Sequence, residues 1–280
     1  MRRWLALVAL LLLASASAHA ACTKVKLNDL NFGDYSGVVN DTTAQLTVRC
    51  DSGFAYSVIL SGGGSANVNA RTMTESASGN KLNYSVYRDA ARSAVWTDVP
   101  GTTTIDGVGT DKDQSYNVYG RIPAGQVVMK ASYQDSPTVS AGGSVDQVRV
   151  STKVVASCTI SAGTLNFGSY TGAVLNAVGT LSVTCNTPTG YHVGLGVGTA
   201  PGATESTRKM TGPSASTLAY ALFSNAGRTT NWGNIGGTGT VAGSGTGRAQ
   251  TLTVYGRMVA GQSIATPGLY TDTVIATVSY

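Results

Sequence analysis

The residues of this chain best suited to covalent chemistry are four cysteines, which occur as two pairs with nearly the same spacing. Cys22 and Cys50 form the first pair, and Cys158 and Cys185 form the second. Thiolates can bind a metal ion, but the chain has no CxxC motif, and His192 is the only histidine after the first 20 residues. A zinc site would need more ligands than these. The cysteines are therefore predicted to form disulfides, for which three pairings are possible.

The other polar residues do not form a recognisable catalytic constellation. Nucleophilic hydrolysis normally places a base beside Ser or Cys, and His192 is alone. Glycoside hydrolysis needs two placed carboxylates, whereas Asp135 and Asp272, which recur along the chain, have no second recurring acid beside them. The glycine-rich stretches lack a phosphate-binding GKS or GKT motif. The sequence therefore predicts a protein that is not an enzyme and that has no cofactor or bound metal.

Residues 1–20 have the pattern of a secretory signal peptide. Two arginines precede a leucine-rich apolar run, and Ala-His-Ala at 18–20 provides small residues for cleavage. Export through the periplasm to the cell surface, or secretion, would permit disulfides. Acylation of Cys22 in a lipoprotein is the alternative. No later apolar stretch is long enough to span a membrane. The net charge of +5, without a Lys/Arg cluster, gives no indication of nucleic-acid binding.

The chain contains an internal repeat. Short motifs occur twice at a nearly constant offset, which indicates a duplicated domain of roughly 120–135 residues. The motifs are LNFG at 30–33 and 165–168, R-x-M-T at 71–74 and 208–211, VYGR at 118–121 and 254–257, and Y-x-D at 133–135 and 270–272. Each copy contains one pair of cysteines, so the repeat selects the pairings Cys22–Cys50 and Cys158–Cys185. The predicted domains are residues 21–156 and 157–280.

Each copy has the pattern of short β strands. Apolar and polar residues alternate at 180–184, 191–195 and 250–255, with glycine-rich turns such as 62–64 between such runs. Glycine is abundant at 35 copies, charged residues make up only 12%, and no segment has helical periodicity. These features predict an all-β fold in which each copy is an antiparallel sandwich.

Recurring aromatic and basic residues are interpreted as parts of the scaffold. Trp96 and Trp232 occupy the same place in both copies, which favours a structural aromatic over a sugar-stacking one. Arg121 and Arg257 are expected to fix a strand end or a carboxylate. The phenylalanines of the two LNFG motifs are candidates for the core.

Together these motifs resemble the spore coat protein U domain, whose relatives include the subunits of archaic chaperone–usher pili. The resemblance covers essentially the whole chain after residue 20. It implies tandem immunoglobulin-like sandwiches of the pilin type, in which a missing final strand leaves an apolar groove. It also implies three partners. An adjacent pilin subunit fills the groove with its N-terminal extension, a periplasmic assembly chaperone covers the groove beforehand, and an outer-membrane usher exports the subunit.

The two copies differ after the Y-x-D motif. The second copy reaches Tyr280 soon afterwards and is expected to lack its final strand. The first copy continues through Gly142-Gly143 into an alternating segment at 145–154. This segment is predicted to complete the first copy in cis, with a donor strand whose inward face consists of Val148, Val150, Thr152 and Val154.

The resulting hypothesis is a two-domain tip adhesin of a pilus, which mediates surface attachment and biofilm formation. After cleavage a single residue, Ala21, would precede Cys22, so the chain is expected to have no strand to donate. The N-terminal copy would contact a surface or host receptor, with Val38, Val39, Phe54 and Val99 as candidate loop residues. Ordinary strand or core positions are the alternative for the first three. A secreted spore-coat or matrix protein, and an exported carbohydrate-binding module, are the alternative functions.

Overall fold

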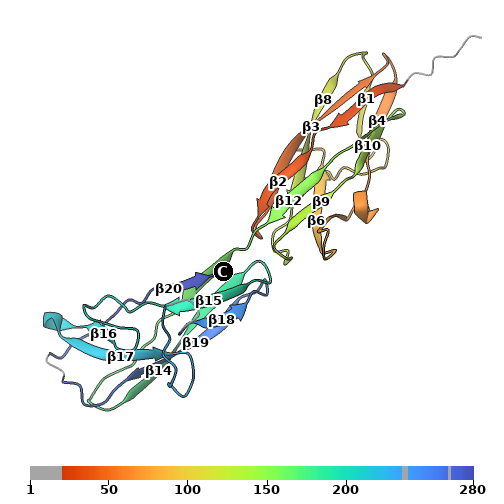
Figure 1. Ribbon diagram of the computed structural model, residues 1–280. Coiled ribbons are helices and arrows are strands. Elements are labelled where there is room, and N and C mark those ends of the chain that lie inside the picture. The colour runs from red at the N-terminus through yellow and green to blue at the C-terminus, as the bar shows by residue number, and fades with distance from the viewer. Residues whose placement is uncertain (1–20, 235–238, 264–265) are drawn as a thin grey trace, which may run out of the picture.

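The computed structural model describes residues 21–234, 239–263 and 266–280, and over these ranges it consists mainly of β strands (Figure 1). Its helical parts there are two short 3₁₀ turns, η1 (Gly63–Ser65) and η2 (Pro213–Ala215). The predicted all-β class with two tandem sandwiches is confirmed. The predicted signal peptide lies outside the described residues. Neither described helix has the length and apolar character needed to cross a membrane.

The N-terminal domain comprises β1 to β12, which form two facing sheets. The larger sheet has the order β1-β3-β8-β6-β5-β9-β12-β2, and the smaller has the order β11-β10-β4-β7. Buried and exposed residues alternate along the strands, because successive side chains point to opposite faces. The strands are β1 (Cys22–Leu27), β2 (Leu30–Tyr35), β3 (Asn40–Cys50), β4 (Ala55–Leu60), β5 (Arg71–Thr74), β6 (Lys81–Tyr87), β7 (Ile105–Val108), β8 (Gln114–Ile122), β9 (Ser132–Asp135), β10 (Thr138–Ala141), β11 (Ser144–Gln147) and β12 (Val150–Val154).

The alternating segment 145–154 is divided between these two sheets. β11 pairs with β10 through a hairpin at Gly142 and Gly143, whose positive φ values suit a two-residue turn. The chain then crosses to the larger sheet, where β12 lies between β9 (antiparallel) and β2 (parallel). Only Val150–Val154 of this segment therefore belongs to the larger sheet, and the N–H of Val148 still donates to the carbonyl of Pro137, just before β10. The sequence pattern did not reveal this break, because both strands alternate with the same period.

The C-terminal domain repeats this framework with fewer strands. Its sheets have the orders β13-β14-β19-β17-β16 and β18-β15-β20. Within the described residues, no strand corresponds to β12, and the second LNFG motif at 165–168 does not form a strand as β2 does. The strands are β13 (Cys158–Ala162), β14 (Leu175–Cys185), β15 (Gly190–Leu195), β16 (Arg208–Thr211), β17 (Thr217–Phe223), β18 (Val241–Ser244), β19 (Gln250–Met258) and β20 (Ala276–Ser279).

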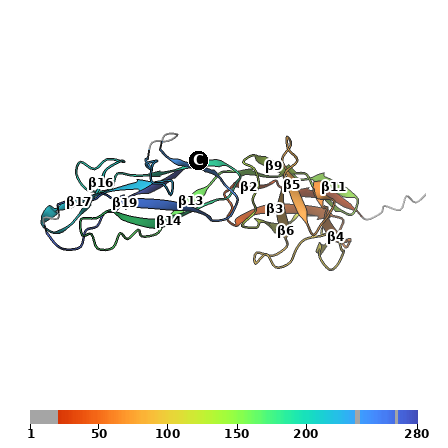
Figure 2. The same cartoon turned by 90° about the horizontal axis from the view of Figure 1, so that it is seen from below.

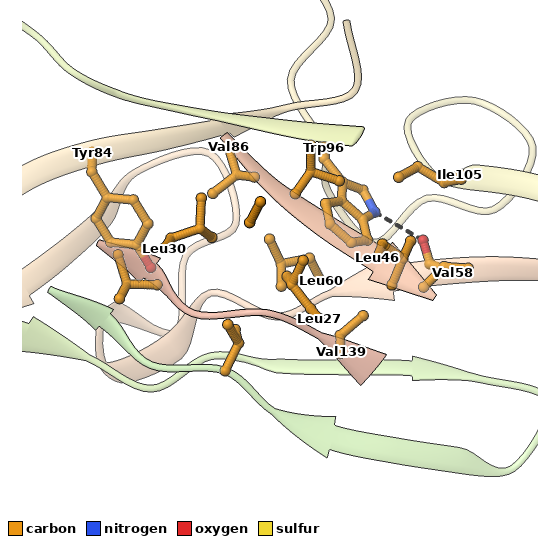
Figure 3. Packing of buried hydrophobic residues seen from close by; sticks show 14 of the residues in the cluster. Leu27, Leu30, Leu46, Val58, Leu60, Tyr84, Val86, Trp96, Ile105 and Val139 are labelled. Atoms are coloured by element: carbon orange, nitrogen blue, oxygen red, sulfur yellow. Dashed lines mark hydrogen bonds between the residues drawn. The ribbon is translucent and has the colours of Figure 1, made fainter. Parts of the chain in front are cut away.

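The core of the N-terminal domain lies between its sheets and centres on Trp96 (Figure 3). The indole is fully buried, and its Nε1 donates a 2.8 Å hydrogen bond to the carbonyl of Val58. Trp232 is equally buried and donates in the same way to the carbonyl of Val193. Each indole thus links the segment after β6 or β17 to the opposite sheet. The interpretation of these residues as structural aromatics agrees with this burial, and neither ring is available for stacking on a sugar.

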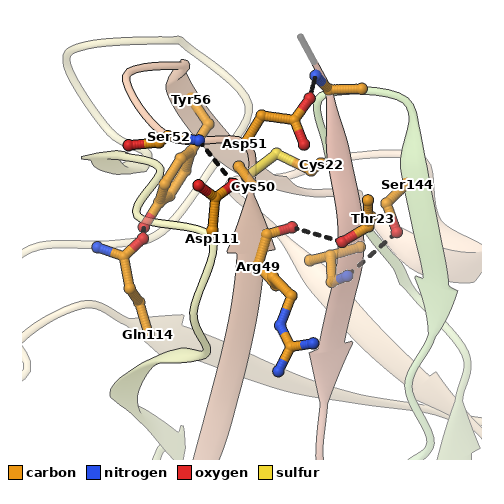
Figure 4. The surroundings of a disulfide bond; sticks show 12 residues. Cys22, Thr23, Arg49, Cys50, Asp51, Ser52, Tyr56, Asp111, Gln114 and Ser144 are labelled. Atoms are coloured by element: carbon orange, nitrogen blue, oxygen red, sulfur yellow. Dashed lines mark hydrogen bonds between the residues drawn. A yellow bond between two sulfur atoms is a disulfide. The ribbon is translucent and has the colours of Figure 1, made fainter.

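Each domain contains one disulfide, between the first strand and the end of the long strand beside it. Cys22–Cys50 joins β1 to β3, and Cys158–Cys185 joins β13 to β14. Around the first disulfide, the Asp51 carboxylate accepts a 2.8 Å hydrogen bond from the backbone N–H of Ala21 (Figure 4). Because the sulfur of Cys22 is bonded to Cys50, this structure does not support acylation of Cys22.

The two domains lie end to end (Figures 1 and 2). Asn186 holds the short linker between β12 and β13: its side chain donates to the carbonyl of Val155 and accepts from the N–H of Ser157. Gly37, in the turn between β2 and β3, packs against this asparagine so closely that an added Cβ would lie 2.7 Å from the Asn186 Cβ. The β2–β3 turn therefore lies at the junction of the domains.

Candidate functional site

The C-terminal domain contains an open groove of about 1080 Å³. Its floor consists of apolar side chains on β17 and β19, including Leu218, Leu222 and Val254. Residues 165–170 form one rim, and residues 267–274 form the other. Neither rim is a regular β strand in this domain. We call this feature the C-terminal groove.

The corresponding space in the N-terminal domain is filled by β12. Val150, Thr152 and Val154 are buried there, while Lys153 is exposed. Val148, expected on the same strand, is also buried but lies just before β12. β9 and β2, which flank β12, correspond to the two rims of the C-terminal groove. The four residues expected to complete the N-terminal domain therefore lie in its interior, and the C-terminal groove is the same site without a strand.

Burial of equivalent residues shows what this strand covers. Within the N-terminal domain the side chains of β2, β5 and β9 that face β12 are sealed from solvent, whereas their C-terminal counterparts are only half-buried. The pairs that differ in this way are Leu30 and Leu165, Phe32 and Phe167, Tyr35 and Tyr170, Met73 and Met210, and Tyr133 and Tyr270. The expectation that Phe167 is a core residue therefore holds only in part, because it lines the groove.

A polar cluster holds the 267–274 rim in the C-terminal domain, and an equivalent cluster holds β9 in the N-terminal domain. In the C-terminal domain the Asp272 carboxylate accepts hydrogen bonds from the Tyr220 hydroxyl (2.7 Å) and from the N–H and hydroxyl of Thr199 (both 2.8 Å). Asp135 accepts equivalent bonds from the Tyr84 hydroxyl (2.6 Å) and the N–H of Gly64 (2.8 Å). The Y-x-D motif therefore attaches the rim to the loop after β4 or β15.

A buried arginine completes each cluster. Arg208 is fully buried, and its Nη2 donates to the carbonyls of Leu195 (2.8 Å) and Trp232 (2.7 Å). Arg71 donates in the same region to the carbonyl of Leu60 (2.7 Å). Burial lowers the pKa of both guanidinium groups from the usual value. Sequence reasoning identified R-x-M-T and Y-x-D as repeats but not as one polar cluster, since these motifs are far apart in the chain and meet only in the fold.

The cluster also raises the pKa of the tyrosine that belongs to it. Burial, and then the hydrogen bond to Asp272, raise the pKa of Tyr220 above its usual value. Burial and the hydrogen bond to Asp135 do the same to the pKa of Tyr84. Both phenols therefore remain protonated donors at neutral pH, and each rim stays attached. The groove is a preformed surface with an apolar floor, which suits the docking of an extended chain rather than catalysis.

The candidate surface-contact residues do not lie together. Val38 and Val39 are exposed (64% and 50%), but they follow Gly37 in the turn at the domain junction. Val99 is exposed (51%) in the loop between Trp96 and β7. Phe54 packs partly against the core, beside Gly142 and Cys22. These four residues therefore do not form a single contact surface. The sequence could not show this, because it does not reveal at which end of the domain each loop lies.

The remaining sequence candidates have local roles. Arg121 makes two hydrogen bonds to the Asp41 carboxylate, from Nε (2.8 Å) and Nη2 (2.9 Å), in agreement with the expected carboxylate contact. Arg257 donates to the side chain of Asn176 instead, at 3.2 Å. His192 is exposed on β15. Among the described residues, no group of three or more His, Cys, Asp or Glu side chains is placed to bind a metal ion.

These features define a class of protein: tandem disulfide-bonded β sandwiches of the pilin type, one filled by its own chain and one with an open groove. The chain belongs to the Spore Coat Protein U domain family, whose sequence profile matches residues 8–140 and again residues 144–277. Protein U of Myxococcus xanthus is 34% identical over 131 residues, a match that covers 42% of this chain and 72% of Protein U.

Among solved structures, both domains together resemble one chain of the CsuC–CsuE complex. This is a chaperone–tip adhesion subunit pre-assembly complex from the archaic chaperone–usher Csu pili of Acinetobacter baumannii. The TM-score is 0.55 at 19% identity, and the match covers 93% of this chain and 100% of that one. At this level of identity the similarity demonstrates a shared fold.

Proposed function

We propose that this protein is a non-enzymatic subunit of an archaic chaperone–usher pilus, located at the fibre tip, where it mediates surface attachment and biofilm formation. The observation that carries the proposal is the open C-terminal groove beside an N-terminal domain whose equivalent groove is filled by β12. An empty groove exposes apolar side chains and unpaired backbone groups, and an added strand would cover both. The C-terminal domain is therefore the part that joins the fibre.

The partners follow from this role. A periplasmic chaperone would cover the groove before assembly, an outer-membrane usher would export the subunit, and an adjacent pilin would then supply the strand. The chaperone-bound state of the Csu subunit complex, which has the same fold, supports the first of these partners. The N-terminal domain would project from the end of the fibre toward the surface that is bound.

The proposed location at the tip is supported by the place of residues 144–157, part of which completes the N-terminal domain of the same molecule. The family profile assigns this segment to the second copy, since its second match begins at residue 144. In the structure, however, β12 from this segment lies within the N-terminal domain. The extension that a second pilin module would offer to a neighbour is thus used inside the same molecule. A subunit with one groove to fill and this extension already engaged fits the end of a fibre.

The proposal can be tested by closing the C-terminal groove with the chain's own strand. Pairing of β10 with β4, and of β20 with β15, aligns Ala141 with Val278. A second copy of residues 142–155, grafted after Val278 in place of Ser279 and Tyr280, should therefore enter the groove as β12 enters its own. We expect the grafted protein to be a stable monomer that no longer enters pili, as judged by immunogold labelling of fibres.

The matched control carries the same graft with Asp at the positions copied from Val148 and Val150. It should not fill the groove and should enter fibres as the unmodified protein does, with label at fibre ends only. Label along the whole shaft would exclude the tip location. Normal incorporation of the protein with the apolar graft would show that the groove has no part in assembly.

A secreted coat or matrix protein is the second candidate function. It is favoured by the similarity to Protein U, which includes most of that protein. The presence or absence of chaperone and usher genes beside the gene for this chain distinguishes the two functions. The carbohydrate-binding alternative has no such support, because the tryptophans on which it depended are buried.

A further inference from the structure

The LNFG motif of the N-terminal domain forms a bulge opposite Thr152. In the pairing of β2 with β12, Ser151 lies opposite Asn31, but Lys153 lies opposite Asp34. Two residues of β2 therefore face the single residue Thr152, which is the pattern of a β-bulge. Gly33 takes φ +67° in this bulge, and its N–H donates to the Asn31 side chain at 2.9 Å.

The bulge places one backbone carbonyl of β2 within reach of a side chain of β12. That carbonyl, of Gly33, accepts a 2.8 Å hydrogen bond from the hydroxyl of Thr152, which is itself only 4% exposed. The other inward residues of the strand are valines. Thr152 is therefore the one polar side chain on the buried face of β12, and its partner is a backbone atom fixed by the LNFG motif.

At the rim of its empty groove, the C-terminal domain has the same local backbone conformation as the LNFG motif at 30–33. Gly168 has φ +76°, and its N–H donates to the Asn166 side chain at 2.8 Å. No described residue donates a hydrogen bond to the Gly168 carbonyl. The groove floor also matches, since Leu218, Tyr220 and Val254 occupy the positions of Leu82, Tyr84 and Val118. Because the two sites match, the inward side chains of β12 predict which side chains a strand needs in order to fit the C-terminal groove.

We propose that the C-terminal groove selects a donor strand with a hydroxyl side chain, Thr or Ser, facing Gly168, and with β-branched apolar residues at two-residue intervals on either side. The occupant is an N-terminal extension of another fibre subunit, so this inference rests on the function proposed above. A strand in the groove would bring a side chain within reach of the Gly168 carbonyl, as β12 brings Thr152 to Gly33. A donor with Val at this position cannot make this hydrogen bond and loses its net contribution to binding.

The test measures binding of synthetic peptides to the full chain, whose own N-terminal groove is already filled. The reference peptide is residues 146–155, labelled for fluorescence anisotropy and incubated to equilibrium. Its Thr152→Val form should bind up to about tenfold more weakly, the loss expected when one hydrogen bond to the groove is not made. Its Thr152→Ser form keeps the hydroxyl and should bind within about fivefold of the reference, the loss expected for one methyl group. Hydrogen exchange should show protection of residues 165–170 on binding.

Two further peptides separate this inference from the proposed function. The Val150→Asp peptide places a charge on the buried face and should not bind, whereas Lys153→Asp places one on the exposed face and should bind. Equal binding of the reference and Thr152→Val peptides, with Val150→Asp still excluded, would overturn the hydroxyl requirement and leave the groove a strand acceptor. Failure of every peptide, or equal binding of Val150→Asp, would overturn the proposed function itself.

Discussion

The two domains share a framework but differ in whether their groove is filled, and this difference explains most of what distinguishes them. Both have the disulfide, the buried tryptophan and the Arg–Tyr–Asp cluster in equivalent places. In the N-terminal domain β12 pairs with β9 and β2. In the C-terminal domain the residues equivalent to β2 and β9 are the rims of a groove, and several apolar side chains on these rims are only half-buried.

The comparison shows which interactions do not depend on the final strand. The C-terminal domain keeps its rim attached through Asp272, although β12 has no counterpart among the described residues. The recurring cluster therefore preserves the groove as a defined binding surface instead of letting it collapse. A preorganised groove lowers the cost of ordering when a strand binds, because less conformational freedom remains to be lost.

The largest expected effect is the loss of the filled state. Val150→Asp puts a carboxylate at a fully buried position of β12, among the apolar side chains of the core. The N-terminal domain should lose at least about 3 kcal/mol of unfolding free energy, because an unpaired buried charge is strongly unfavourable. Hydrogen exchange with mass spectrometry, which reports on each domain separately, should show the loss in residues 21–154 and little change in the C-terminal domain.

Lys153→Asp is the matched control, since Lys153 is exposed on the same strand. It should leave hydrogen exchange nearly unchanged. Equal destabilisation by the two substitutions would mean that β12 is sensitive to charge in general and not to which face carries it.

Removing the disulfides should affect the domains one at a time. Replacing both Cys22 and Cys50 with Ser should cost the N-terminal domain about 2–5 kcal/mol, and the Cys158 and Cys185 double substitution should cost the C-terminal domain a similar amount. Denaturant unfolding followed by domain-resolved hydrogen exchange measures each effect. Non-reducing peptide mapping of the unmodified chain should find no peptide that joins the two domains.

Much of this architecture could be predicted from the sequence because the same set of motifs occurs twice along the chain. The constant offset between motifs indicates two modules, and alternation within them indicates strands. The alternation of Val148, Val150, Thr152 and Val154 also predicts which residues share a face. What alternation could not predict is that β11 and β12 lie in different sheets, since a residue pattern of period two is identical in both.

The functional details depend on contacts between distant segments, which a single sequence does not reveal. Asp272 contacts Tyr220, and Arg208 lies beside both residues. These contacts form only when β16, β17 and the 267–274 rim come together in the fold. The hydroxyl contact of Thr152 depends in turn on a bulge at Gly33. A threonine among valines reads as an ordinary strand residue until its partner is known.

Alkaline pH should affect the N-terminal domain more than the C-terminal domain. Burial raises the pKa of Tyr35, Tyr56, Tyr84 and Tyr133 in the first, and of Tyr220 in the second. A raised pKa means that the folded state keeps a proton that the unfolded state loses near pH ~10. The stabilisation is therefore fully present below about pH 10 and declines as pH rises further.

Domain-resolved unfolding between neutral pH and pH ~11 measures this difference. The unfolding free energy of the N-terminal domain should fall more steeply with pH. Parallel slopes for the two domains would show that the additional buried tyrosines of the N-terminal domain do not contribute to its pH dependence.

The smallest expected effect concerns the hydroxyl that β12 presents to the bulge. Thr152→Val removes the donor to the Gly33 carbonyl but keeps the β-branched shape, so the buried apolar contacts of the strand change little. The carbonyl then loses its side-chain partner, and the N-terminal domain should lose about 1 kcal/mol, the net contribution of one hydrogen bond. Thr152→Ser keeps the hydroxyl and gives up one methyl group, which should cost about 1 kcal/mol.

The decisive observation is the infrared band of a ¹³C-labelled Gly33 carbonyl, which should move to higher frequency in the Val variant and stay in place in the Ser variant. An unmoved band in the Val variant would show that the bulge finds another donor, and the parallel drawn with Gly168 in the open groove would then lose its basis.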